Sequence, residues 1–357
     1  MHDEEGPTMS EHEQDHAAIP LSWVGPVRIS GNVMDDELKV PLATYETPLW
    51  PSCGRGAKIT RLIDGGVTCT LVDERMTRSV LFTLDSAAEA VRVRDLIRAE
   101  LPALQEVVGR SSRFARLIEV NSEIAGRLLV LRFEFTSGDA SGHNMATLAA
   151  ENLMTHLMGV HPELGYGSIS ANYCTDKKVS AVNGILGRGK HIIAEAVIPE
   201  QVVRERLRTT ATRLVELNER KNLIGSILAG SLRSANAHYA NMLLGFYLAT
   251  GQDAANIVEG SQGITQVEDV DGAVRFSCTL PNLIVGSVGN GKGLDFVEAN
   301  LDRLGCRAER EPGDNARRLA ACCAAVVWCG ELSLLAAQTN PGELMATHVG
   351  IERAGGA

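Results

Sequence analysis

The chain has 357 residues and a mass of 38.2 kDa, a length that predicts two domains rather than a single hydrophobic core. Its formal net charge is −10, and six acidic residues precede the first lysine or arginine, Arg28, which argues against a nucleic-acid partner because phosphate backbones are bound by clustered cations. Apolar residues make up 45% of the chain but aromatic residues only 4%. Together with 35 glycines, this composition predicts a core of small side chains and closely approaching backbones.

The apolar stretches are too short for a membrane span. The most apolar run, residues 319–330, is closed by Arg318 and Glu331 and is well below the length of about 20 residues that a bilayer requires. The N-terminal sequence lacks the basic start and apolar run of a signal peptide. The eight cysteines are scattered without C-x-x-C spacing, which predicts free thiols and no structural zinc. We therefore expect a cytoplasmic protein without a metal, a membrane or a nucleic-acid partner.

In chain order, the first segment is acidic, and its composition predicts a disordered tail over residues 1–18. A β-rich segment punctuated by Gly and Pro follows from residue 19 to about residue 61. Residues 79–168 then alternate as strand, helix, strand, strand, helix and strand. This order is typical of the ferredoxin-like fold, so we expect a small domain inserted into a larger domain built from residues 19–78 and 169–340.

The second part of the large domain is predicted to begin with a strand at residues 190–198. A surface helix is expected over residues 199–221. Residues 222–250 are nearly uncharged, and a helix that is apolar on all sides is a buried one, so we expect this segment to be the central helix of an α+β large domain. The remaining expected elements are a hairpin turned at Asp271 and Gly272, an Ala-rich helix at 315–338 and a mobile tail at 341–357.

A glycine-rich stretch between these elements imitates a phosphate-binding loop. Residues 286–293, GSVGNGKG, match the pattern GxxxxGK, but Gly293 replaces the Ser or Thr that would hold magnesium, and no helix is expected directly after it. No GxGxxG pattern follows a strand elsewhere in the chain. A flexible glycine loop beside a ligand is therefore a better interpretation than a nucleotide triphosphatase.

A polar segment, Asn172-Tyr-Cys-Thr-Asp-Lys177-Lys178, follows the last expected strand of the small domain directly. Adjacent lysines with a carboxylate at a domain junction indicate a positioned cation, although the segment alone would also fit a solvated turn. Other ionisable residues stand singly among small or apolar neighbours, where burial shifts a pKa: Glu46, Asp253 and His348.

The segment NYCTDKK, together with GRGK, KNLIGS, GQDAAN, SRFARL, SGDASGHNM and GELSL, resembles the 3-hydroxy-3-methylglutaryl-coenzyme A (HMG-CoA) reductases. The resemblance is collinear over residues 19–349 and is greatest to the eukaryotic-type class in a soluble, bacterial form. It implies reduction of HMG-CoA to mevalonate and free coenzyme A by two hydride transfers from NADPH, in the mevalonate route to isoprenoids. It assigns the catalytic roles to Glu46, Lys177, Asp253 and His348.

In the implied chemistry, Lys177 stabilises the oxyanion that hydride addition creates, and Asp253 keeps this lysine charged and hydrogen-bonds Glu46. Glu46 stays protonated and donates to the aldehyde, while His348 protonates the departing thiolate. The NADPH-binding positions carried over from the resemblance are Ser112, Arg113, Asp139, Gly142, Asn144, Gly286, Gly289 and Gly291. The substrate-binding positions are Ser52, Arg55, Lys58, Arg78, Ser170, Asn172, Lys178, Lys221, His238 and Asn241.

Some of these positions have simpler interpretations. Ser52, Arg55 and Lys58, which would face coenzyme A, also fit solvated charges, and His238 with Asn241 also fits an internally satisfied polar pair. The resemblance further implies a homo-oligomer, a dimer or a dimer of dimers, with the active site between subunits. Two other functions stay open: a silent homologue that binds acyl-CoA, and the same enzyme oxidising mevalonate.

Overall fold

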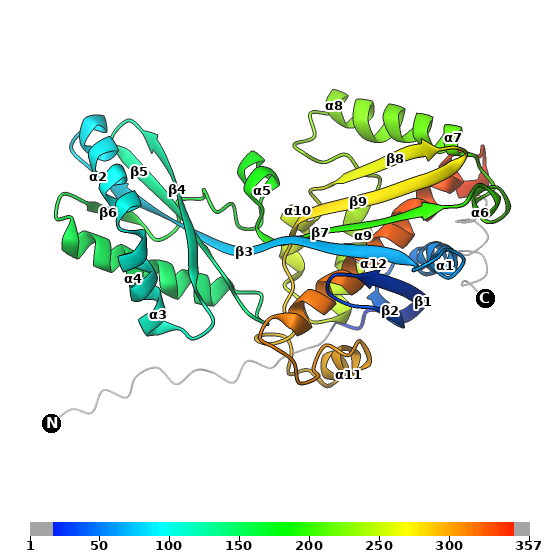
Figure 1. Cartoon of the computed structure of the whole chain (residues 1–357), viewed down its shortest axis with the longest axis horizontal. Coiled ribbons are helices and arrows are strands. Elements are labelled where there is room, and N and C mark those ends of the chain that lie inside the picture. Colours follow the sequence, from blue (N-terminus) through cyan, green and yellow to red (C-terminus); the bar gives the residue numbers. More distant parts are fainter. Residues whose placement is uncertain (1–16, 346–357) are drawn as a thin grey trace.

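A computed structural model of the chain describes residues 17–345. The greater part of the expected acidic tail and of the expected C-terminal tail, including His348, lies outside the described residues. Figure 1 shows two bodies of unequal size joined side by side, and each encloses its own cluster of buried apolar residues. The larger cluster draws on segments from both ends of the described chain, whereas the smaller one lies between Met76 and Leu164.

One long strand, β3 (Val67–Thr83), runs through both bodies (Figure 1). Its first half pairs in parallel with β1 and antiparallel with β7, and from Met76 onward it pairs with β5 and β6 instead. The expected domain boundary at residue 79 therefore falls inside a continuous strand. The fold contains both parallel and antiparallel pairs and is of the α+β class.

The smaller body consists of a four-stranded sheet in the order β6-β3-β5-β4, in which all neighbours are antiparallel. The single helical stretch expected between its first two strands is divided into two helices, because Pro102 lies in the first turn of the second one, where its missing N–H is tolerated. Its other elements are α2 (Ala87–Ala99), α3 (Leu101–Ser111), β4 (Leu117–Ala125), β5 (Leu128–Phe135), α4 (His143–Val160) and β6 (Gly165–Ser168).

The larger body has a six-stranded sheet in the order β2-β1-β3-β7-β9-β8. The expected hairpin at Asp271 and Gly272 is confirmed, since both residues adopt positive φ between the paired strands β8 and β9. Besides β3, the strands are β1 (Leu21–Gly31), β2 (Asp36–Ala43), β7 (Gly189–Ile198), β8 (Ile264–Val270) and β9 (Ala273–Leu283).

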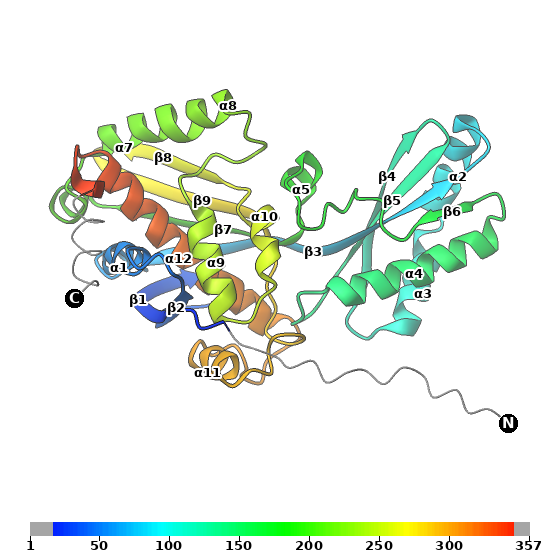
Figure 2. The same cartoon turned by 180° about the vertical axis from the view of Figure 1, so that it is seen from behind.

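The central helix of the larger body is α12 (Asp314–Gln338), which packs against α1, β7 and α9 (Figure 2). It is long and apolar enough to span a membrane, but 94% of its apolar window is buried inside this protein. Small residues allow its close contacts: a Cβ added to Gly56 of α1 (Leu49–Thr60) would lie 2.1 Å from the carbonyl oxygen of Cys329. All eight cysteines lie in the described part, and they are buried and unpaired.

The prediction that residues 222–250 form the central helix is wrong. This stretch contains the π-helix η2 (Asn218–Gly225), a short α8 (Ser226–Leu228), an irregular connection and α9 (Tyr239–Ala249). Gly230 and Arg233 adopt left-handed φ values of 72° and 47°, which end the helix, and Leu228 is 83% exposed.

Two other expectations need correction. The β-rich segment ends before α1, whose buried positions Leu49, Cys53 and Gly56 have helical spacing because they face α12. The surface helix expected over 199–221 is interrupted at Arg208, which has a φ of 56°. The remaining short elements are α5 (Ala181–Leu186), α6 (Glu200–Val202), η1 (Val203–Leu207), α7 (Ala211–Leu217), η3 (Ala254–Asn256), α10 (Ile257–Gly260) and α11 (Asp295–Arg303).

Candidate active site

The NYCTDKK segment forms a tight loop between β6 and α5, at the junction of the two bodies (Figure 1). Three of its residues, Asn172, Thr175 and Lys177, have positive φ values of 58°, 44° and 56°. Such conformations cost about 1–3 kcal/mol each for residues other than glycine, and they persist only where neighbouring groups hold them. Ser79 of β3 supplies part of that support, because its hydroxyl oxygen accepts hydrogen bonds from two backbone N–H groups of the loop, at 2.9 and 3.1 Å.

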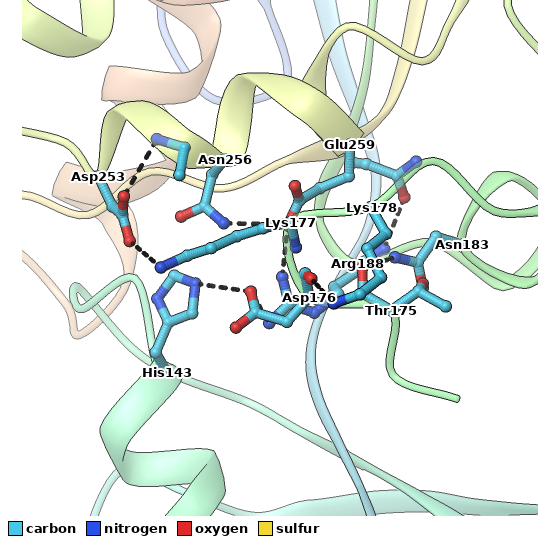
Figure 3. A network of polar contacts seen from close by, with 12 residues as sticks. His143, Thr175, Asp176, Lys177, Lys178, Asn183, Arg188, Asp253, Asn256 and Glu259 are labelled. Carbon is cyan, nitrogen blue, oxygen red and sulfur yellow. Dashed lines mark hydrogen bonds and ion pairs between the residues drawn. The ribbon is translucent and has the colours of Figure 1, made fainter. Parts of the chain in front are cut away.

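The loop presents the ammonium group of Lys177 to a carboxylate. Lys177 Nζ lies 2.8 Å from Asp253 Oδ2, and both side chains remain partly exposed (Figure 3). Asp253 is fixed in turn at the start of η3, where its Oδ1 accepts a hydrogen bond from the N–H of Ala255. The hydrogen bond with Asp253 raises the pKa of Lys177 above its usual value. Burial alone would raise the pKa of Asp253, but the hydrogen bonds from Lys177 and Ala255 and the charge of Lys177 together lower that pKa. The pair is therefore a stable ammonium and carboxylate at neutral pH.

A buried layer of charges lies beneath this pair. Arg188 donates to Asp176 at 3.0 Å and to Glu259 at 2.8 Å, and the side chains of Arg188 and Glu259 are almost completely buried. Burial raises the pKa of Glu259, whereas Arg188 opposes that shift. The smaller body contributes one side chain to the cluster: His143, the first residue of α4, places its Nε2 3.6 Å from Asp176 Oδ1 (Figure 3).

Burial alone would raise the pKa of Asp176, but His143 and Arg188 together hold it well below its usual range. Sequence reasoning assigned no role to His143, Arg188 or Glu259. His143 lies within SGDASGHNM and Arg188 within GRGK, so their membership of these motifs could have identified both as site residues. Glu259 lies outside the quoted motifs, three residues beyond GQDAAN, and nothing around it in the sequence indicates its burial.

Glu46 lies in a different place from Lys177 and Asp253. It is exposed on the turn between β2 and α1, at the rim of a cavity of about 940 Å³. The lining of this cavity includes five residues that were predicted to bind substrate, namely Ser52, Arg55, Lys58, His238 and Asn241. No hydrogen bond or ion pair within residues 17–345 joins Glu46 to Lys177 or Asp253. The described chain thus brings two of the four predicted catalytic residues together and leaves the third in this cavity.

Several cavity residues also have partners inside the protein. Arg55 pairs with Glu343 at 2.9 Å and donates to the carbonyl oxygen of Leu207. His238 lies 3.0 Å from the carbonyl oxygen of Gly330 through Nε2 and 3.4 Å from the side-chain nitrogen of Asn241 through Nδ1. The interpretation of His238 and Asn241 as a satisfied polar pair therefore fits the structure, and one edge of each side chain still faces the cavity.

The other predicted substrate residues lie in or near the Lys177 loop, with one exception. Asn172 and Lys178 are exposed in the loop itself, and Ser170 precedes it. Arg78 of β3 has a buried Nε without a hydrogen-bond partner among the described residues. Lys221 is the exception: it belongs to η2, donates to Asn222 at 3.3 Å, and has a pKa that burial lowers.

The predicted cofactor residues from SGDASGHNM lie beside the glycine-rich loop, because Ala140 pairs with Val288. Gly142 has a φ of 94° and precedes α4, and Asn144 is exposed in the first turn of that helix. Asp139 has a further structural role, since its two carboxylate oxygens accept the N–H groups of Gly313 and Ala316 and so cap α12.

The glycines of the second predicted cofactor segment differ in their surroundings. A Cβ at Gly286 would lie 2.3 Å from the backbone nitrogen of Ser141, so this residue allows close packing. Gly289 has a φ of 103° and open space where a Cβ would point. Gly291 has a φ of 80° and closely approaches Gly251.

Ser112 and Arg113 lie at the far end of α3. The Ser112 hydroxyl oxygen accepts the N–H groups of Phe114 and Ala115 and thereby orders the turn. Arg113 is exposed, with its guanidinium group 5.7 Å from the centre of the Phe114 ring.

Lys292, the lysine of the GxxxxGK pattern, is buried and donates to the carbonyl oxygen of Gly251, so it is not a free phosphate ligand.

Burial lowers the pKa of Lys292 from 10.5 to about 8. At pH values between these two pKa values, Lys292 is protonated in the unfolded chain and neutral in the folded chain. The unfolded chain therefore binds one more proton, and the free energy of unfolding rises with pH. We expect the difference in unfolding free energy between the wild type and Lys292→Met to increase from pH 8 to pH 10, as measured by urea denaturation. The exposed Lys39→Met is the control and should show no such slope; a flat difference for Lys292→Met would contradict the assignment.

The arrangement of the two bodies matches solved structures of one class of oxidoreductase. A class II 3-hydroxy-3-methylglutaryl-CoA reductase from Streptococcus pneumoniae, solved bound to NADPH in open conformations, superposes with a TM-score of 0.73 at 20% identity. The match covers 93% of this chain and 78% of that one. At 20% identity, this match shows that the two chains share a fold.

Sequence comparison identifies the family. The profile of the hydroxymethylglutaryl-coenzyme A reductase family matches residues 2–353. The reductase of Pyrococcus horikoshii is 43% identical over 322 residues, which cover 89% of this chain and 78% of the relative. The reductase of Methanocaldococcus jannaschii is 41% identical over 338 residues, which cover 93% and 80%. The chain belongs to the hydroxymethylglutaryl-coenzyme A reductase family and is an oxidoreductase.

Proposed function

We propose that the chain is an NADPH-dependent reductase that converts HMG-CoA to mevalonate and free coenzyme A in the cytoplasm, as a step of isoprenoid synthesis. The observation that carries the proposal is the ammonium group of Lys177, which Asp253 holds at 2.8 Å at the junction between the two bodies. A costly loop conformation maintained around one lysine is typical of a functional site.

The chemistry assigned to Lys177 follows from its charge and its fixed position. NADPH, when bound, supplies the hydride. Addition of a hydride to a carbonyl carbon places negative charge on the oxygen, and a preorganised cation stabilises that charge without reorganising in the transition state. Asp253 keeps Lys177 protonated, because their hydrogen bond raises the pKa of the lysine. We assign proton donation to the aldehyde oxygen to Glu46, and protonation of the thiolate to His348, which lies outside the described residues.

The smaller body, whose elements follow the order strand, two helices, two strands, helix and strand, is the proposed NADPH-binding domain. The residues at its edge fit a dinucleotide: Gly289 has open space at its Cβ position, and the buried hydroxyl of neighbouring Ser287 has no hydrogen-bond partner within the described chain. Asn144 lies at the N-terminus of α4, where free N–H groups favour phosphate. Arg113, exposed at the end of α3, would bind the 2′-phosphate.

The cavity beside Glu46 is the proposed coenzyme A site. Its lining contains five cationic side chains: Arg55, Lys58, Arg61, Arg206 and Arg208. Coenzyme A carries phosphates, and a concave surface with several cations raises the local concentration of such an anion. The cavity also has an apolar wall, formed by residues such as Leu62 and Leu334, that suits the pantetheine arm.

The separation of Glu46 from Lys177 supports an active site that two subunits share. α1 lies at the end of the larger body away from the smaller body, whereas α5, next to Lys177, lies at the junction (Figures 1 and 2). A second copy would bring its Glu46 to the Lys177 of the first. Exposed apolar side chains on α5 and α8, namely Ile185, Ile227 and Leu228, are suited to a subunit interface.

This arrangement predicts complementation between inactive variants. A mixture of Lys177→Ala and Glu46→Gln chains, unfolded together and refolded, should regain about a quarter of the wild-type activity, because half of the random dimers are mixed and each of these has one intact site. Each variant refolded alone is the control. Recovery of no activity from the mixture would contradict a shared site.

The proposed function is tested by following NADPH oxidation with HMG-CoA as substrate, with NADH measured in parallel. We expect turnover that yields two NADP⁺ for each coenzyme A released. Tight coenzyme A binding without oxidation would show instead a silent acyl-CoA-binding homologue. Turnover only in the direction of mevalonate oxidation would reverse the proposed reaction.

A further inference from the structure

Glu259 is a buried carboxylate that contacts the Lys177 loop from the protein interior. It lies on α10, and a single oxygen, Oε1, is shared by three donors (Figure 3). These are the backbone N–H of Lys177 at 3.1 Å, a guanidinium nitrogen of Arg188 at 2.8 Å and the side-chain amide of Asn256 at 2.9 Å. One atom therefore ties together the loop, the start of β7 and the η3–α10 segment.

The same segment holds Lys177 at two points. Asp253, six residues before Glu259, binds the ammonium group, and Glu259 binds the backbone N–H of the same lysine. The second contact matters because Lys177 has a φ of 56°, which an unsupported lysine would leave. Without this anchor, the backbone would relax and the ammonium group would move away from Asp253.

Arg188 makes a buried carboxylate at this position tolerable. Its side chain is 1% exposed, and it binds Glu259 through one terminal nitrogen and Asp176 through the other. An unpaired buried carboxylate would either take up a proton or be drawn toward water. Arg188 thus keeps Glu259 in place and fixes the residue before Lys177 as well.

We propose that Glu259, held by Arg188, is a positioning residue that fixes the backbone of Lys177 so that its ammonium group lies where the oxyanion forms. The proposal rests on the proposed function and adds a residue to the same site. Glu259 does not touch the reacting atoms; it acts through Lys177. The hydrogen bond to Glu259 explains how Lys177 keeps a left-handed backbone conformation that usually requires glycine.

The test combines kinetics with a chemical readout of Lys177. In Glu259→Ala we expect kcat for HMG-CoA reduction to fall about 10- to 100-fold with KM changed less than about threefold, because a displacement of about 1 Å is enough for such a loss. Reductive methylation followed by mass spectrometry should show faster modification of Lys177, while the exposed Lys58 is unchanged. Glu259→Gln keeps an acceptor at Oε1 and loses the charge, so kcat and the methylation rate of Lys177 should change less than in Glu259→Ala. If Glu259→Ala does not fold, Glu259→Gln is the variant that tests whether Glu259 anchors Lys177.

Glu331→Gln is the matched control, because Glu331 is also completely buried and accepts two backbone N–H groups, those of Ala237 and His238, but it lies on α12 and has no hydrogen bond or ion pair with the Lys177 loop within residues 17–345. It should lower thermal stability and leave the methylation rate of Lys177 unchanged. The proposal needs both changes in a folded Glu259 variant, and it is overturned if kcat or the methylation rate stays at the wild-type value. Should the wild type not reduce HMG-CoA, the proposed function fails, and the methylation rates still decide whether Glu259 anchors Lys177.

Discussion

Replacing Lys177 with alanine should reduce kcat for HMG-CoA by at least about 10²- to 10³-fold, the loss seen when one preorganised oxyanion donor is removed. The expected loss is large because the ammonium group is held by Asp253 and by the backbone of a constrained loop. The side chain is partly exposed, so the folded state should survive its removal. The measurement is steady-state NADPH oxidation on protein whose circular dichroism matches the wild type.

Lys39→Ala is a suitable comparison, because Lys39 is an exposed lysine on β2 with no role in the proposed chemistry. It should retain wild-type turnover. Wild-type turnover in Lys177→Ala would remove the basis of the proposed mechanism, since no other cation within residues 17–345 is bound to Asp253.

The second large effect concerns stability. Glu134 on β5 is completely buried and binds both Arg75 and Arg132, and the guanidinium of Arg132 also donates to the carbonyl oxygen of Gly187 at 2.6 Å. Burial lowers the pKa of Arg132 to about 10, because removal from water disfavours the charged guanidinium. Glu134→Ala would leave a buried cation uncompensated, and we expect the free energy of unfolding to fall by about 3–5 kcal/mol.

Urea denaturation of Glu134→Ala tests this value. The comparison is Glu216→Ala, which removes an exposed pair with Arg220 one helical turn away and should cost only about 0.3–0.5 kcal/mol. Equal losses in the two variants would mean that the buried cluster contributes no more than a surface pair.

The elements that could be predicted from the sequence have strong local signals. Strand alternation predicts the sheet of the smaller body. Asp271-Gly272 predicts the β8–β9 hairpin of the larger body, because only a few residue types tolerate two successive positive φ values. The prediction for residues 222–250 is wrong because low charge does not by itself show that a segment is buried. Exposed apolar residues such as Leu228 have the same composition as buried ones, and only the tertiary structure, or a partner, separates the two cases.

The part of the candidate site that lies in short sequence motifs could be predicted from the sequence. Lys177 and Asp253 were expected to meet, and they do. Glu259 was not predicted, because a glutamate in the sequence VEGS has no local sign of burial and its partner Arg188 is 71 residues away. Glu46 was expected to meet Lys177 and Asp253, but within the described chain it lines a separate cavity, and the proposed meeting of these residues requires a second copy.

The strand β3 constrains how the two bodies can move relative to one another. Since its backbone belongs to both sheets, neither sheet can swing away without bending that strand near Arg75 and Met76, where its partners change. Opening and closing over the proposed dinucleotide would then be a small elastic bend of β3 with a restoring force. It would not be a free rotation about a flexible linker.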